Sequence, residues 1–204
     1  LSQLMVRTGA DLHPYSASCT PWLSKEKESL SYGVESFSLG LTSMMSWLDQ
    51  LGIDSFDSFM DRKIPFNFEK APHVFPTIKE RVFPFTQLDY LYHILSVDGG
   101  SESDAILQGV LQSVMFQIKK MLLDCESDLG LRLKELHVSG SLSERDDMMQ
   151  FLADLLQLSV IRHKSTDSHV IGIAGLMGIP NSFFSTSNDM YSLNKVAKAF
   201  VPSV

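Results

Sequence analysis

The sequence predicts an α/β fold, in which helices and strands alternate along the chain. Apolar residues recur at helical spacing over residues 102–124, and a strand, a helix and a second strand follow over residues 133–162. The tight turn Ser139-Gly140-Ser141 joins the first of these strands to its helix. This order is that of a βαβ unit, whose two strands lie parallel.

The composition and charge exclude several classes of protein. Of the 204 residues, 44% are hydrophobic and 20% are charged, which excludes intrinsic disorder and collagen-like repeats. The net charge is −7 without a Lys/Arg cluster, so neither nucleic acid nor an anionic membrane is an expected partner. The longest apolar stretch is shorter than the roughly 18 residues of a membrane span.

Cysteine and histidine spacing predicts neither a disulfide framework nor a metal site. Cys19 and Cys125 lie far apart, so we expect free thiols in a reducing compartment, the cytoplasm. The six histidines show no HExxH or paired spacing, and P-loop and GxSxG motifs are missing from the sequence. The chain starts without a signal peptide or an initiator Met, which leads us to expect a fragment of a longer protein.

In the first half of the chain, the pattern predicts one strand and one helix. The first thirty residues are expected to be irregular, because prolines interrupt them. Residues 32–39 alternate and predict a strand, and a helix is expected from about Leu41 to a stop at Gly52. Residues 63–88 hold four prolines and predict extended chain and loop with short edge strands.

The second half is more regular. It predicts a helix over 102–124, a strand over 133–138, a helix with Ser143 and Asp146 as its start signal, and a strand over 158–162. Two more helices are expected over 168–179 and 189–200. A helix that opens after a small-residue turn presents backbone N–H groups, which suit an anion such as phosphate.

The stretch from Leu133 to Ile179 resembles the carboxy-terminal signature of the FGGY family of carbohydrate kinases. The matching words are Leu136-His137-Val138-Ser139-Gly140-Ser141, then Gln150-Phe151-Leu152-Ala153-Asp154-Leu155, then Ile171-Gly172-Ile173-Ala174-Gly175-Leu176-Met177-Gly178. Upstream, Tyr32-Gly33-Val34-Glu35 and the segment from Pro76 to Pro84 are also similar to family words. Sedoheptulose-type kinases look nearest, because they also carry Ser-Gly-Ser with an Arg four positions later.

The resemblance implies an actin-like ATPase fold, related to ribonuclease H, with a mixed sheet and helices on both faces. Residues 1–204 would form a single carboxy-terminal, nucleotide-side domain of a kinase that transfers the γ-phosphate of ATP to a ketose or polyol hydroxyl. The sugar pocket and the catalytic base would lie in an amino-terminal domain that this chain lacks. No catalytic residue is therefore assigned, and magnesium would be held through the nucleotide phosphates.

The resemblance also implies a nucleotide site. The turn Ser139-Gly140-Ser141 would approach the adenosine, and Arg145 could stack on adenine or meet phosphate. The family places a glycine pair near the phosphates, before the helix that carries Trp47. That pair falls on Leu41-Thr42 here, which makes Thr42 and Ser43 the candidate phosphate contacts.

Other interpretations remain open for each of these residues. Ser141 and Ser143 could be helix N-caps, Arg145 a solvated residue, Thr42 and Ser43 helix-surface residues, and Gln150 and Asp154 structural. Because Ser141 and Leu41-Thr42 replace family glycines, the alternative function is a weak or inactive FGGY-like pseudokinase with an interaction or regulatory role. An unrelated α/β domain is the third possibility.

Overall fold

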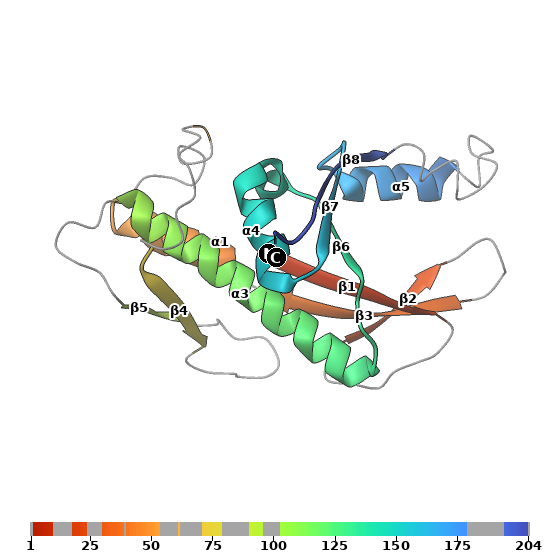
Figure 1. Cartoon of the computed structure of the whole chain (residues 1–204), viewed down its shortest axis with the longest axis horizontal. Coiled ribbons are helices and arrows are strands. Elements are labelled where there is room, and N and C mark those ends of the chain that lie inside the picture. Colours follow the sequence, from red (N-terminus) through yellow and green to blue (C-terminus); the bar gives the residue numbers. More distant parts are fainter. Residues whose placement is uncertain are drawn as a thin grey trace. The chain divides into compact units, whose positions relative to one another are not determined.

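A computed structural model of the chain describes residues 2–9, 18–23, 30–38, 40–53, 61, 71–78, 90–95, 103–178 and 194–203. The contacts within it divide the chain into two compact units, which are Leu1–Met5 with Glu35–Asp124 and Val6–Val34 with Cys125–Val204. Figure 1 labels their helices and strands. That residues 1–204 form a single domain stays a prediction.

The first strands form a three-stranded sheet. β1 (Ser2–Gly9), β2 (Ser18–Leu23) and β3 (Leu30–Ser38) lie in the order β1-β3-β2. β3 confirms the strand expected over 32–39, but the expectation of irregular chain before it was wrong. Pro21 lies in β2, which is an edge strand, and an edge position tolerates a residue that has no N–H to donate.

A helix and a hairpin follow in the first unit. α1 (Gly40–Gln50) confirms the helix expected here, and Gly52, at φ 71°, donates its N–H to the carbonyl of Asp49 and ends it. β4 (His73–Ile78) pairs antiparallel with β5 (Tyr90–Leu95). β4 lies in the stretch where short edge strands were expected.

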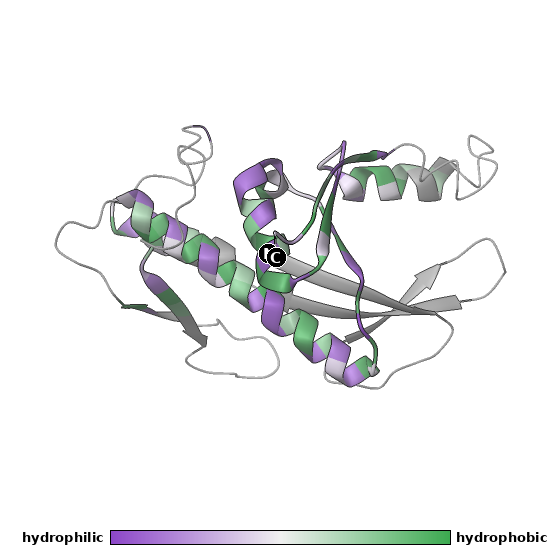
Figure 2. Cartoon of the chain, in the orientation of Figure 1, coloured by the Kyte–Doolittle hydropathy of each residue, from purple (hydrophilic) through white to green (hydrophobic). Residues whose placement is uncertain are grey.

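The long helix α3 (Ser103–Leu129) confirms the most regular apolar pattern in the sequence and continues beyond residue 124. Figure 2 shows hydrophobic and hydrophilic residues alternating along it. Its buried stripe includes Leu107, Val110, Leu111 and Val114. No helix among the described residues combines the length and apolar character that crossing a membrane requires.

The second unit contains a mixed sheet in the order β6-β7-β8. β6 (Glu135–Val138) and β7 (Ser159–His163) are parallel, and α4 (Asp146–Leu156) connects them, so the expected βαβ unit is confirmed. α4 buries Met148, Met149, Leu152 and Leu156, and packs against β7. α5 (Ser168–Gly178) confirms the glycine-bearing helix.

The last element corrects the sequence analysis. A helix was expected over 189–200, but Val196–Phe200 form the strand β8, antiparallel to β7. Phe200 lies opposite the buried Val160 and is 3% exposed. Pairing with a strand 30 to 40 positions earlier therefore overrides the helical preference of this short Ala- and Lys-containing segment.

Candidate functional site

The corner between β6 and the following helix is open at Gly140. Ser139, Gly140 and Ser141 are exposed, and Gly140 adopts φ 95° and ψ 167°, a conformation that side chains with a Cβ rarely take. Among the described residues, no atom lies within 4 Å of the place where a Cβ on Gly140 would be. The Gly140 N–H donates to the Thr166 carbonyl at 3.1 Å, which ties the corner to the loop after β7.

Ser143 holds the corner from inside. Its hydroxyl donates to the Gly140 carbonyl at 2.6 Å, its N–H donates to the same carbonyl at 3.0 Å, and the residue is 2% exposed. Ser143 belongs to a short 3₁₀ helix, η1 (Ser141–Glu144), which ends before α4 begins at Asp146. The expectation that Ser143 starts or caps one continuous helix was therefore wrong, because its hydroxyl is a donor to a carbonyl and not an acceptor for a free N–H.

Arg145 links η1 to α4, and its side chain is only 10% exposed. Its Nη2 lies 2.6 Å from Asp147 Oδ2, and its Nε donates to Asp147 Oδ1 at 3.1 Å. The hypothesis of a solvated residue is thus corrected. A contact between Arg145 and a nucleotide stays a prediction, and it would require the guanidinium to exchange Asp147 for the ligand.

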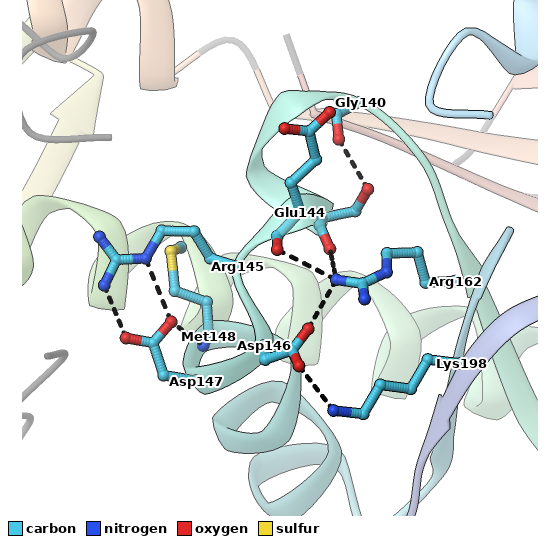
Figure 3. A network of polar contacts seen from close by, with 9 residues as sticks. Gly140, Glu144, Arg145, Asp146, Asp147, Met148, Arg162 and Lys198 are labelled. Carbon is cyan, nitrogen blue, oxygen red and sulfur yellow. Dashed lines mark hydrogen bonds and ion pairs between the residues drawn. The ribbon is translucent and has the colours of Figure 1, made fainter. Parts of the chain in front are cut away.

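Asp146 joins the start of α4 to two strands of the sheet. Its Oδ1 lies 2.8 Å from Arg162 Nη1 on β7, and its Oδ2 lies 2.6 Å from Lys198 Nζ on β8 (Figure 3). The hydrogen bond from Lys198 holds the pKa of Asp146 below its ordinary value. Arg162 acts in the same direction, and partial burial opposes both.

Arg162 also supports the backbone that leads out of the corner. Its Nη1 donates to the carbonyls of Ser143 at 2.9 Å and Glu144 at 3.1 Å. These two carbonyls belong to the last residues of η1. The guanidinium therefore gives a hydrogen-bond donor to acceptors that a helix end leaves without an intrahelical partner. The sequence pattern does not predict this role, because it indicates only a strand at Arg162 and a helix at Lys198.

Gln150 and Asp154 have the structural role that was offered as their alternative. Gln150 Nε2 donates to the Val201 carbonyl at 2.8 Å, and Asp154 Oδ1 accepts the Ser203 N–H at 2.7 Å. That N–H is the main reason why the pKa of Asp154 is lowered. The two side chains therefore bind the chain that follows β8 to α4.

Thr42 and Ser43 lie in the first turn of α1, which begins at Gly40. Their side chains fall outside the described residues, so their contact with phosphate stays a prediction. Within the part of the chain that the structure describes, no three or more His, Cys, Asp or Glu side chains are grouped to hold a metal ion.

Comparison with known proteins gives the family. The profile of the FGGY family of carbohydrate kinases, C-terminal domain, matches residues 17–179. A glycerol kinase of Alkaliphilus oremlandii is 27% identical over 179 residues, which cover 86% of this chain and 35% of that protein. The chain thus spans about a third of the length of this relative.

Solved structures show the fold. A Plasmodium falciparum glycerol kinase, determined with ADP, superposes with a TM-score of 0.72 at 17% identity and covers 98% of this chain and 41% of that one. A xylulose kinase of Lactobacillus acidophilus, determined with a ligand, gives 0.65 at 13% identity and covers 98% and 40%. The α/β fold is therefore that of the actin-like ATPases, as expected. With the family profile matching most of its length, this chain belongs to the FGGY family of carbohydrate kinases, in which it corresponds to the carboxy-terminal domain.

Proposed function

We propose that this chain is the nucleotide-side domain of an ATP-dependent carbohydrate kinase, and that the adenosine of ATP packs on the corner Ser139-Gly140-Ser141. The open position at Gly140 is the observation that carries this proposal. A Cβ there would stand where a flat ligand would approach the backbone, and its lack leaves open space beside the turn. The ADP in the Plasmodium falciparum glycerol kinase structure supports nucleotide binding.

The reaction proposed is transfer of the ATP γ-phosphate to a hydroxyl of a polyol or ketose. Glycerol, xylulose and gluconate kinases are among the relatives, and the Ser-Gly-Ser turn followed by Arg145 favours a sedoheptulose-like sugar within this class. An amino-terminal domain outside this chain would bind the sugar and provide the base. The wide separation of Cys19 and Cys125 along the sequence suits a reducing compartment, and we place the working protein in the cytoplasm.

Phosphoryl transfer depends on positioning and on neutralising charge more than on covalent chemistry. ATP, with magnesium on its phosphates, supplies the transferred group. Gly140 and Ser141 would seat the nucleoside, and Ser143 and Arg162 would hold the shape of that seat. Arg145 would approach the adenine, and a contact of Thr42 and Ser43 with phosphate stays a prediction from the family resemblance alone.

A second candidate function is a catalytically weak or inactive FGGY-like domain with a regulatory role. The observation that favours it is the engagement of Arg145, whose guanidinium is paired with Asp147 and is 10% exposed. A cation held in this way adds little to phosphate binding. The replacement of a family glycine by Thr42 acts in the same direction, because its Cβ keeps phosphate away from the backbone.

Calorimetric titration of magnesium–ATP into the full-length protein tests both functions. The kinase proposal expects saturable binding, which Gly140→Val and Ser141→Tyr weaken at least tenfold. Gly130→Val is the matched control, because Gly130 also has a positive φ (61°) and open space around it but lies after α3. Thermal unfolding of each variant checks that it is folded.

The other outcomes each have a meaning. Equal affinity in all three variants would show that the corner is not the nucleotide seat. No binding by the folded wild-type protein would support the regulatory function instead. Arg145→Ala and Asp147→Ala then test whether Arg145 binds nucleotide. If it does, Arg145→Ala lowers the ATP affinity. Asp147→Ala raises the ATP affinity, because it releases the guanidinium from its ion pair.

A further inference from the structure

Two histidines on the neighbouring strands β6 and β7 of the second unit's sheet face each other. His137 on β6 lies opposite Ile161, so His163 lies two residues further along β7 on the same face. Their ring centroids lie 5.1 Å apart and their planes meet at 23°. His137 Nδ1 lies 2.8 Å from His163 Nε2, and the His137 side chain is 49% exposed.

In each ring, the nitrogen that points away from the other histidine, here called the outer nitrogen, already has a hydrogen-bond partner. His137 Nε2 lies 3.0 Å from Glu135 Oε1, and His163 Nδ1 lies 2.7 Å from the Asn194 carbonyl. A carboxylate and a carbonyl only accept hydrogen bonds, so both outer nitrogens carry a hydrogen. The inner nitrogens, His137 Nδ1 and His163 Nε2, then direct lone pairs at each other.

Two converging lone pairs repel each other unless a cation lies between them. The surroundings also match those of metal-binding histidines, which donate their second N–H to a carboxylate or a backbone carbonyl. Such partners orient each ring and raise the basicity of its free nitrogen. Glu135 and Asn194 provide one partner of each kind.

We propose that His137 and His163 form a two-histidine clip for a divalent transition-metal ion of the zinc type. Imidazole nitrogens suit zinc, nickel and copper better than magnesium, so this ion would be distinct from one held by nucleotide phosphates. Zinc–nitrogen bonds of about 2.0–2.1 Å require the inner nitrogens to separate to about 3.3 Å at a tetrahedral angle. Rotation of the half-exposed His137 ring supplies this opening. Water completes the coordination, since no third side chain among the described residues joins the group.

The clip lies close in sequence to the two chain segments that form the corner at Gly140. His137 lies three positions before Gly140, and His163 lies three positions before Thr166, whose carbonyl accepts the Gly140 N–H. An ion that joins the two rings would brace both connections that shape the corner. Binding to the folded chain alone would also raise its thermal stability by mass action.

Titration of the chain with Co²⁺, followed by visible absorption, and with Zn²⁺, followed by calorimetry, tests the clip. We expect one ion per chain, and at least tenfold weaker binding in His137→Ala and in His163→Ala. His169→Ala is the control, because His169 is exposed on α5, and we expect it to bind like the wild type. Zn²⁺ should raise the unfolding temperature of the wild type but not of His137→Ala.

A further variant tests the orienting role of the carboxylate. Glu135→Gln keeps both histidine ligands and should lower the zinc affinity about tenfold. No binding to the wild type would overturn the proposal. Binding that survives in the double variant of His137 and His163 would overturn it equally. If His163→Ala fails to fold, the exposed His137→Ala decides alone.

Discussion

Two glycines, one in each unit, have opposite surroundings. On α3, a Cβ on Gly109 would lie 2.2 Å from the Pro72 carbonyl oxygen and 3.2 Å from a methyl carbon of Val74, so the helix touches the chain that leads into β4. At the corner after β6, a Cβ on Gly140 would meet no described atom within 4 Å. The first glycine is required by packing and the second by its backbone angle.

The difference teaches where a ligand can act. Gly109 leaves no free surface, because the neighbouring backbone occupies the place of its side chain. Gly140 shapes a turn and leaves backbone exposed beside the open position. Only the second kind of glycine can serve both the fold and a bound molecule, and the two kinds should respond differently to substitution.

The largest expected effect is that of Gly109→Ala. The added methyl group cannot fit 2.2 Å from a backbone oxygen, so α3 or the segment at Pro72 must shift. Overpacking of this kind costs about 1–3 kcal/mol, and a clash with backbone belongs at the upper end. Denaturation by urea should show this loss, and the midpoint should fall accordingly.

The matched control for Gly109 is Gly172→Ala on α5. Gly172 is also a helical glycine, but it has no described atom within 4 Å of its Cβ position. Alanine favours a helix over glycine by about 1 kcal/mol, so this variant should be neutral or more stable. Equal destabilisation in both variants would contradict the packing role of Gly109.

Gly140→Ala should have the next largest effect on stability. The residue has φ 95° and ψ 167°, and a Cβ at such angles costs about 1–3 kcal/mol without any clash. In contrast to Gly109, the loss should also appear in ATP binding by the full-length protein. Gly52→Ala is the control, because Gly52 (φ 71°) also has open space but lies after α1. If the ATP affinity falls equally in Gly140→Ala and Gly52→Ala, Gly140 does not act locally in nucleotide binding.

Ser143→Ala tests how much the buried hydroxyl of Ser143 stabilises the turn at Gly140. The change removes a 2.6 Å hydrogen bond to the Gly140 carbonyl at a residue that is 2% exposed. We expect a loss of about 1 kcal/mol, because the carbonyl keeps the Ser143 N–H as a donor. Ser141→Ala, at an exposed position in the same turn, should leave stability unchanged. Equal losses in the two variants would show that the hydroxyl of Ser143 is not what holds the turn.

The sequence could predict the parts of this molecule that depend on local pattern. α3, α4 and β7 follow from apolar spacing, and the corner at Gly140 follows from a small-residue turn between a strand and a helix. β8 was missed because its conformation depends on pairing with β7. The Asp146–Lys198 contact was missed for the same reason, since its partners are 52 positions apart.

The smallest expected effect is the loss, in acid, of the stability that the ion pairs of Asp146 contribute. Lys198 and Arg162 lower the pKa of this carboxyl in the folded chain, so the contribution to stability is present in full above the unfolded pKa near 3.8. It is lost as the pH falls through the lower folded value, when the carboxylate takes up its proton. Because the Asp146 side chain is 53% exposed, the effect should be at most about 1 kcal/mol.

Asp146→Asn should therefore be less stable than the wild type at neutral pH, and the gap should close as the pH falls below the unfolded value. Urea denaturation across an acid series measures the gap. Asp124→Asn is the control, because the partner of Asp124 among the described residues is the exposed Lys120, one turn away on α3, and the change should affect stability less. A gap that stays constant into acid would mean that Asp146 holds α4 to the sheet through hydrogen bonds that the protonated carboxyl keeps and the amide loses. The corner would then owe its shape to the backbone angle of Gly140 and to Ser143 more than to charge.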